Sequence, residues 1–153
     1  MAMHQLTFEQ KLPTELDTLW EFISSPMNLA KITPPSMDFR VTKPLMSDYI
    51  YPGMFIAYKV SPLWGISMEW VTEITQVEEK KYFVDEQRKG PYKIWHHEHH
   101  LIPQDDGILM RDIISYQVPF GPLGDLLNAM MIQKKIEGIF KFREEKLRII
   151  FPW

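Results

Sequence analysis

The stretch FVDEQRKGPYKIWHHEHHLIPQDDGILMRDIISYQV, Phe83–Val118, contains three alternating segments separated by two turn sequences. The turns are Lys89-Gly90-Pro91 and Pro103 to Gly107, where glycine, proline and aspartate favour chain reversal. Apolar and polar side chains alternate within each segment, which is the period of a β-strand with one buried face. Because the connections are short enough for hairpins, the stretch predicts three neighbouring antiparallel strands.

The rest of the chain extends this sheet and adds helices. Met3–Lys11 alternates in the same way and predicts a first strand, and helical spacing predicts two short helices over 15–23 and 26–32. Asp125–Ile150 has apolar residues at helical spacing and predicts one long C-terminal helix. Six predicted strands follow the first one, and the last three of them are the strands of the opening stretch. They are Met37–Lys43, Phe55–Ser61, Ile66–Glu79, Lys81–Gln87, Tyr92–Ile102 and Ile108–Val118.

This order predicts an α+β fold, because an antiparallel sheet must cover its apolar face and one long helix is available to do so. We expect a seven-stranded curved antiparallel sheet wrapped around the long C-terminal helix, with two short helices after strand 1. A curved sheet that grips a helix leaves a cavity between them. The 153 residues contain no repeat or linker, so we expect a single domain over 1–153.

The element order resembles the helix-grip fold of the SRPBCC superfamily, which includes START lipid-transfer domains, Bet v 1-like allergens and polyketide cyclase/dehydrase-like proteins. The resemblance is closest at four segments that cover about two thirds of the chain: Phe22–Pro35, Gly65–Thr75, Phe83–Leu101 and Met110–Gly124. It implies the fold and a hydrophobic cavity that binds a ligand. Members of the superfamily carry, transfer, sense or transform their ligands, so a reaction is not implied.

Composition excludes several other classes of protein. The net charge is −3 and no basic run could follow a phosphate backbone, so nucleic acid is not an expected partner. The chain has no cysteine, which excludes disulfides and thiolate zinc sites. No apolar run of membrane-spanning length and no signal-peptide pattern occur, so we expect a cytoplasmic protein without stable membrane insertion.

The seven residues Trp95–Leu101 divide into two sets, because alternate side chains of a strand point to opposite faces. The inner set is bounded by apolar residues and consists of Trp95, His97, His99 and Leu101. The outer set is uniformly polar, suits solvent, and consists of His96, Glu98 and His100. Hairpin pairing then places Asp85 or Gln87 near Trp95 or His97, and Asp112 near His97 or His99.

The inner faces of these strands predict an apolar and aromatic pocket with a polar band. The expected ligand-binding residues are Trp70, Asp85, Gln87, Trp95, His97, His99, Asp112 and Tyr116. Such a pocket suits a small apolar or amphipathic molecule that a few polar groups orient. Two segments, Ser61–Gly65 with Leu63 and Trp64, and Pro119–Gly124, are expected to frame its entrance.

Two alternatives use the same residues. In the first, His97 or His99 is a general acid/base, Asp112 or Asp85 fixes its tautomer, and the substrate is a polyketide-like or other carbonyl compound. In the second, His97 and His99 bind a metal ion with Asp112 or Asp85 as the third ligand. One H-x-H motif is weak evidence for a metal, so we expect no metal and no other cofactor.

Overall fold

The computed structural model describes residues 2–62 and 65–153. These residues form a seven-stranded antiparallel sheet with the strand order β1-β7-β6-β5-β4-β3-β2. The three strands of the Phe83–Val118 stretch lie together in it, as their alternation predicts. The strands are β1 (His4–Leu12), β2 (Arg40–Val41), β3 (Phe55–Val60), β4 (Met68–Glu78), β5 (Tyr82–Lys89), β6 (Ile94–Gln104) and β7 (Gly107–Gln117).

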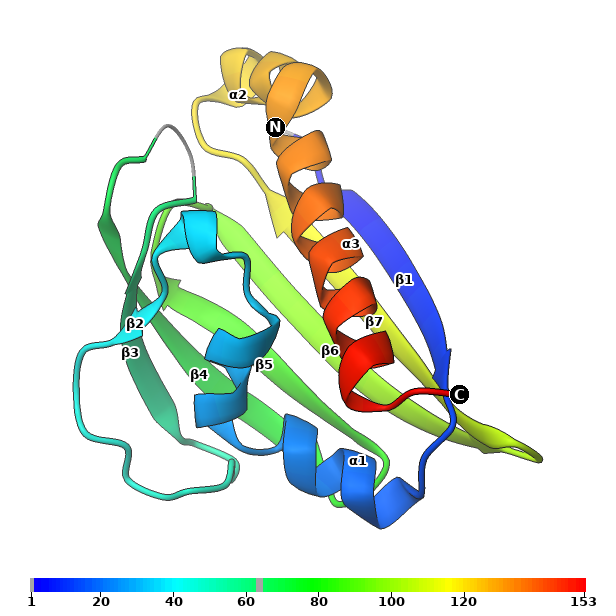
Figure 1. Cartoon of the computed structure of the whole chain (residues 1–153). Helices are drawn as coiled ribbons and strands as arrows, with labels where there is room; N and C mark the ends of the chain where they lie inside the picture. The colour runs from blue at the N-terminus through cyan, green and yellow to red at the C-terminus, as the bar shows by residue number, and fades with distance from the viewer. Residues whose placement is uncertain (1, 63–64) are drawn as a thin grey trace.

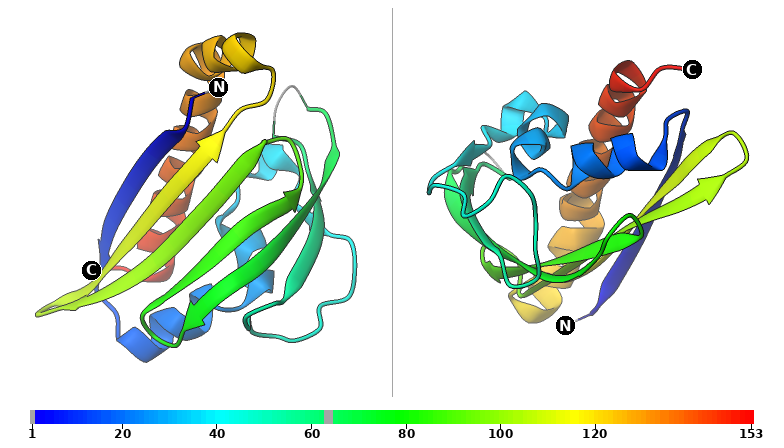
Figure 2. Two further views of the ribbon diagram at one scale, coloured as in Figure 1. Left: turned by 180° about the vertical axis from the view of Figure 1, so that it is seen from behind. Right: turned by 90° about the horizontal axis from the view of Figure 1, so that it is seen from below.

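The helical segments lie on the concave side of this curved sheet, as Figures 1 and 2 show. The predicted helices after the first strand are α1 (Leu16–Ile23) and the 3-10 helix η1 (Pro26–Ile32), and a 3-10 turn, η2 (Pro35–Met37), follows. The C-terminal helical run consists of α2 (Gly121–Leu127), a π-helical turn, η3 (Asn128–Ile132), and α3 (Gln133–Ile150). The predicted α+β helix-grip architecture is therefore confirmed.

Strict alternation gives β7 two faces of different character. Along this strand every second residue is buried, and the buried positions include Met110, Asp112, Ile114 and Tyr116. Between β4 and β5 the register shifts twice, at Val71/Thr72 and at Ile74/Gln76. Such irregularities bend a strand and increase its twist, which helps the sheet to curve around α3.

Strand β2 is shorter than predicted, because the backbone turns where the strand was expected to begin. The prediction was Met37–Lys43, but Met37 ends the η2 turn and Asp38 adopts a left-handed conformation with φ of 48°. A strand cannot continue through that conformation. Only Arg40 and Val41 pair with β3.

The C-terminal helical run begins earlier than predicted. Pro119–Gly124 was expected to be a break, but α2 starts at Gly121, where Pro122 costs no hydrogen bond because first-turn amides have no partner within the helix. Gly124 packs so closely on the carbonyl oxygen of Pro119 that a Cβ would lie 1.8 Å from it. The sequence GPLG therefore starts a helix here instead of separating one from the sheet.

The buried face of α3 crosses the core. Its buried residues are Ile136, Phe140, Arg143 and Leu147, which recur at helical spacing. Phe140 stacks on Phe8 of β1 with ring centroids 4.4 Å apart. One arginine thus lies within an otherwise apolar stripe.

Candidate functional site

Four polar side chains meet on the inner face of the sheet, where β5, β6 and β7 lie side by side. Asp85 of β5 is the register partner of His97, and Asp112 of β7 is the register partner of His99. Both histidines and Asp112 are less than 10% exposed. Hairpin pairing predicted this meeting, and we call the four residues the His–Asp quartet.

Each histidine of the quartet contacts both aspartates. The shortest contacts are His99 Nε2 to Asp85 Oδ2 at 2.5 Å and His97 Nε2 to Asp112 Oδ1 at 2.8 Å. The other two ring nitrogens lie 3.3 Å (His99 Nδ1 to Asp112) and 3.6 Å (His97 Nδ1 to Asp85) from the opposite carboxylate. The imidazoles stack with centroids 3.6 Å apart, so one aspartate lies at each edge of the stack.

Burial and the contacts within the quartet shift the pKa of all four residues. Burial opposes the charge on both carboxyl groups, but the adjacent histidines outweigh it and hold the pKa of Asp85 and Asp112 below the usual range. Burial and the neighbouring His99 lower the pKa of His97. Burial also opposes the charge on His99, but its bonds to Asp112 and Asp85 are stronger and raise its pKa. A proton on the imidazole pair therefore rests on His99, the ring with the shorter contacts.

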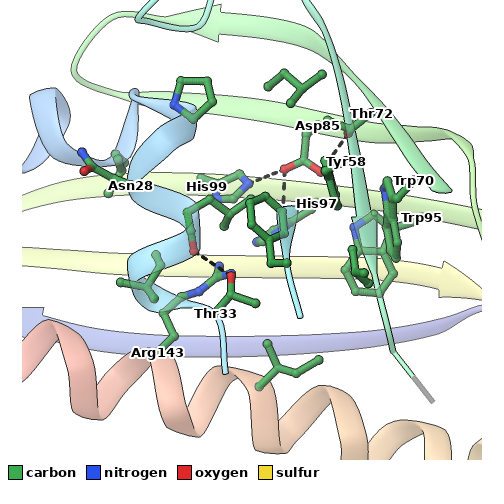
Figure 3. Close-up of a pocket in the computed structure, with 18 of the residues that line it drawn as sticks. Asn28, Thr33, Tyr58, Trp70, Thr72, Asp85, Trp95, His97, His99 and Arg143 are labelled. Atoms are coloured by element: carbon green, nitrogen blue, oxygen red, sulfur yellow. Dashed lines mark hydrogen bonds and ion pairs between the residues drawn. The ribbon is translucent and has the colours of Figure 1, made fainter. Parts of the chain in front are cut away.

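Three members of the quartet, Asp85, His97 and His99, form part of the wall of a cavity between the sheet, η1 and α3, drawn in Figure 3. The cavity has a volume of about 170 Å³ and its lining is mainly apolar. Aliphatic residues of the lining include Leu29 and Ile32 of η1, Ile56 and Val60 of β3, and Ile136 and Ile139 of α3.

Aromatic residues form one end of this cavity. The Trp70 ring is perpendicular to the Trp95 ring at 5.4 Å and stacks with Tyr58 at 6.0 Å between centroids. Tyr92 packs on Trp95 at 4.7 Å. Rings held against one another in this way lose little further freedom when a ligand binds, which favours affinity.

The structure brings five of the predicted binding residues to the cavity lining and places three elsewhere. The five are Trp70, Asp85, Trp95, His97 and His99. Gln87 instead braces the β5–β6 turn, where its amide donates to the Tyr92 carbonyl at 2.6 Å and accepts from the Tyr92 amide at 3.0 Å. A side chain at Gly90 would collide with this glutamine.

Asp112 and Tyr116 are the other two residues outside the cavity lining. Asp112 lies behind the histidines and faces a second hollow, of about 310 Å³, between β1, β7 and α3. Tyr116 is fully buried and donates a hydrogen bond of 2.6 Å to Asn128 Oδ1 in the η3 turn. Asp112 therefore acts on the cavity through His97 and His99, and Tyr116 anchors the C-terminal helical run.

Sequence reasoning missed several polar residues of the cavity lining, among them Arg143 of α3 and Tyr58 of β3. Arg143 is charged, so the apolar spacing that predicts the C-terminal helix does not include it. Its spacing from Ile136, Phe140 and Leu147 was the available signal, because it falls within the buried stripe. Tyr58 alternates with Ile56 and Val60, which identifies it as an inward residue of β3.

The outer set of β6 faces solvent, as predicted. Its three side chains are about one third exposed. His100 Nε2 contacts Glu98 at 3.1 Å, and His96 Nδ1 contacts Glu86 at 3.3 Å. Exposed pairs of this kind contribute little to stability.

Asp85, His97 and His99 could approach a metal ion, since one ligand atom from each lies within 4.8 Å of the others. Two ligands of a tetrahedral zinc ion with bonds of about 2.0–2.1 Å are roughly 3.3 Å apart. The 2.5 Å between His99 Nε2 and Asp85 is a direct hydrogen bond, which an ion would have to replace. The geometry of this pair fits proton sharing better than shared metal ligation.

The two segments expected at the entrance differ in their relation to the cavity. Pro62 contributes to the lining, whereas Leu63 and Trp64 lie outside the described residues. Pro119–Gly124 contributes no lining residue. The 3-10 helix η1 lies over the cavity instead, with Pro26 and Leu29 in the lining.

A scan against protein-family models and a search of curated proteins each found no match to this sequence. Solved structures do match. A START superfamily protein from Mycobacterium smegmatis has a TM-score of 0.71 at 11% identity, over 96% of this chain and 99% of that one. The chain has the SRPBCC helix-grip fold. The helix-grip fold that the resemblance implied is thereby confirmed.

Two further structures show the same SRPBCC fold. Ara h 8.0201 has a TM-score of 0.63 at 15% identity, over 95% of this chain and 98% of that one. Major latex-like protein 151 from Panax ginseng has a TM-score of 0.60 at 16% identity, over 89% of this chain and 96% of that one. Identities this low establish a shared SRPBCC architecture and leave the ligand to be inferred from the site.

Among the helices of the described residues, none is both long and apolar enough to cross a membrane.

Proposed function

We propose that this SRPBCC-fold protein binds a small, largely apolar or amphipathic molecule in the cavity between the curved sheet and α3. The observation that carries the proposal is the lining: mainly aliphatic and aromatic side chains surround a space that a few polar residues, among them Asp85, His97 and His99 of the quartet, also border. Small-molecule sites commonly combine an apolar wall with a few placed polar groups. The superfamily that the fold represents also supplies ligand-binding proteins.

The quartet suits a role in orienting such a ligand. Its aspartates and histidines satisfy one another's hydrogen-bonding groups, so the quartet does not need a ligand to be stable. His97 and His99 also border the cavity, and each can exchange a bond to an aspartate for one to a ligand. The ligand would thus be apolar along the aromatic end and would carry a polar group near the quartet.

Native mass spectrometry of the protein purified from its own cells tests this function. We expect a bound small molecule, and we expect Ile56→Trp, which fills the cavity from β3, to lose it. The neighbouring Phe55→Trp adds bulk to an exposed position on the opposite face and should retain the molecule. Equal occupancy in both variants, with both folded by circular dichroism, would place binding outside the cavity.

A second candidate function is the cyclase/dehydrase-type enzyme, and the state of His97 favours it. His97 borders the cavity, its pKa is lowered by burial and by His99, and Asp112 contacts its Nε2 atom. A neutral imidazole held by a carboxylate can remove a proton next to a carbonyl group. Incubating the bound molecule with the protein separates the two functions: conversion that His97→Gln abolishes supports the enzyme, and unchanged ligand supports the binding protein.

A further inference from the structure

Arg143 is a buried cation that has no direct partner among the described residues. Its side chain leaves α3 toward the cavity and is 8% exposed. Among the residues that the structure describes, its guanidinium has no hydrogen-bond or ion-pair partner, and its Nε atom is fully enclosed. The guanidinium carbon lies 4.7 Å from the centroid of the Phe140 ring, which is a weaker interaction than an ion pair.

Burying a charge in this way is costly unless something compensates it. Burial lowers the pKa of Arg143, and the more distant Asp112, Asp85 and Tyr58 counteract this only through space. Both aspartates already bind the two imidazoles. They are therefore not available to form a direct salt bridge with the arginine.

The charged residues near Arg143 favour the binding of an anion from the cavity and disfavour its approach from the second hollow. The charged and titratable groups that line the cavity are Tyr58 on β3, Asp85 on β5, Tyr92 before β6, His97 and His99 on β6, and Arg143 on α3, with Asp112 on β7 behind the histidines. The second hollow presents Glu9, Glu137 and Glu144 with Lys141, which repels an anion overall. Of the quartet's two carboxylates, Asp112 lies outside the cavity lining, and Asp85 lines the cavity with an imidazole nitrogen of each histidine beside it.

The aromatic end of the cavity and Arg143 lie apart. Figure 3 shows Arg143 on one side of His97 and Trp70 and Trp95 on the other. The Tyr58 hydroxyl forms no hydrogen bond with a described residue, so it offers a second donor in the same cavity. A molecule with an apolar body and a terminal acceptor group matches this division.

We propose that Arg143 binds the carboxylate of an amphipathic ligand whose apolar part occupies the aromatic end of the cavity. This inference rests on the proposed binding function and specifies the class of ligand. A guanidinium can donate two parallel hydrogen bonds to a carboxylate, and such charge-assisted bonds are about twice as strong as neutral ones. The ligand would supply the direct ion pair that Arg143 lacks.

Isothermal titration calorimetry at pH 7 with three probes of equal chain length tests the proposal. The probes are octanoate, octan-1-ol and octylammonium. We expect wild-type protein to bind octanoate about tenfold more tightly than octan-1-ol, which is the effect of one charge-assisted hydrogen bond, and to bind octylammonium least. Arg143→Met should remove the preference for octanoate while retaining the binding of octan-1-ol.

A matched control and two further variants complete the experiment. Arg148→Met removes an exposed arginine from the same helix, and it should keep the wild-type preference. Arg143→Lys keeps the positive charge but lacks the planar guanidinium, so it should retain part of the preference for octanoate. It is the informative variant if Arg143→Met does not fold. Tyr58→Phe should weaken octanoate binding by a smaller factor than Arg143→Met.

The outcomes separate this inference from the function on which it rests. A tenfold preference that depends on Arg143 supports it. Equal affinity of the wild type for octanoate and octan-1-ol, or a preference that survives Arg143→Met, overturns the carboxylate inference and leaves apolar binding in place. Failure of all three probes to bind would count against both the binding function and the inference.

Discussion

The inner and outer faces of β6 each carry two histidines with carboxylate neighbours, but in different surroundings. His97 and His99 are buried, stacked and held by carboxylates at 2.8 and 2.5 Å. His96 and His100 contact glutamates at 3.3 and 3.1 Å on a partly exposed surface. The comparison shows that the face of the sheet on which a histidine lies, and not its residue type, decides whether it is buried at the cavity.

The largest expected difference between the faces is in stability. Asp112→Ala removes the carboxylate that contacts both inner histidines and leaves the charge on His99 with one partner, so the free energy of unfolding should fall by about 3–5 kcal/mol. Glu98→Ala removes the acceptor of the outer pair and should cost at most about 1 kcal/mol. Urea denaturation followed by circular dichroism measures both. Similar losses would remove the distinction between the faces.

The second prediction concerns the dependence of stability on pH. Because the pKa of folded His99 is raised, its contribution is complete below the unfolded histidine value of about 6.5 and is lost as the pH rises through the folded pKa. The lowered pKa of Asp85 and Asp112 contributes stability above about 3.9 that is lost as the pH falls. The pKa of His97 is lowered, so its contribution to stability depends on pH in the opposite way to that of His99. It favours the folded state above about pH 6.5 and is lost as the pH falls toward the folded pKa of His97.

Titration of the imidazole signals by nuclear magnetic resonance measures these directions. One inner histidine, His99, should remain protonated above pH 6.5, and His97 should remain neutral below it. Asp85→Asn should lower the pKa of His99, since it removes an adjacent negative charge. If both inner rings titrated together in the wild type and in this variant, the quartet would not control its protonation.

The smallest effect is expected when both outer histidines are removed. The double variant His96→Ala/His100→Ala breaks only exposed contacts, so its free energy of unfolding should change by about 0.5 kcal/mol or less. Thermal unfolding beside the Asp112→Ala variant checks this value. A loss as large as that of Asp112→Ala would mean that the outer set is structural.

Strand alternation predicted the quartet because its members lie on adjacent strands whose pairing short turns restrict. Asp85, His97, His99 and Asp112 all lie within the two hairpins of the Phe83–Val118 stretch. Alternation assigns a face to each residue but not the direction of its terminal atoms. Gln87 therefore turns toward the Tyr92 backbone, and Tyr116 reaches Asn128, although both start on the predicted face.

Strand alternation could not predict the wall of the cavity that the helices form. Arg143 and the η1 residues reach the cavity through the packing of helices on the sheet, and contacts between segments so distant in sequence follow no local period. The short β2 strand has a similar cause, because the left-handed Asp38 is a property of one residue's backbone. The sequence thus predicted the architecture and half of the site.

The most direct test of the ligand-binding account follows the imidazole signals of all four β6 histidines while octanoate is added. Because the inner face lines the cavity, the signals of His97 and His99 should shift with octanoate concentration and saturate. The signals of His96 and His100 should stay where they are. Movement of the outer signals, or unchanged inner signals at a concentration that saturates binding by calorimetry, would contradict the account.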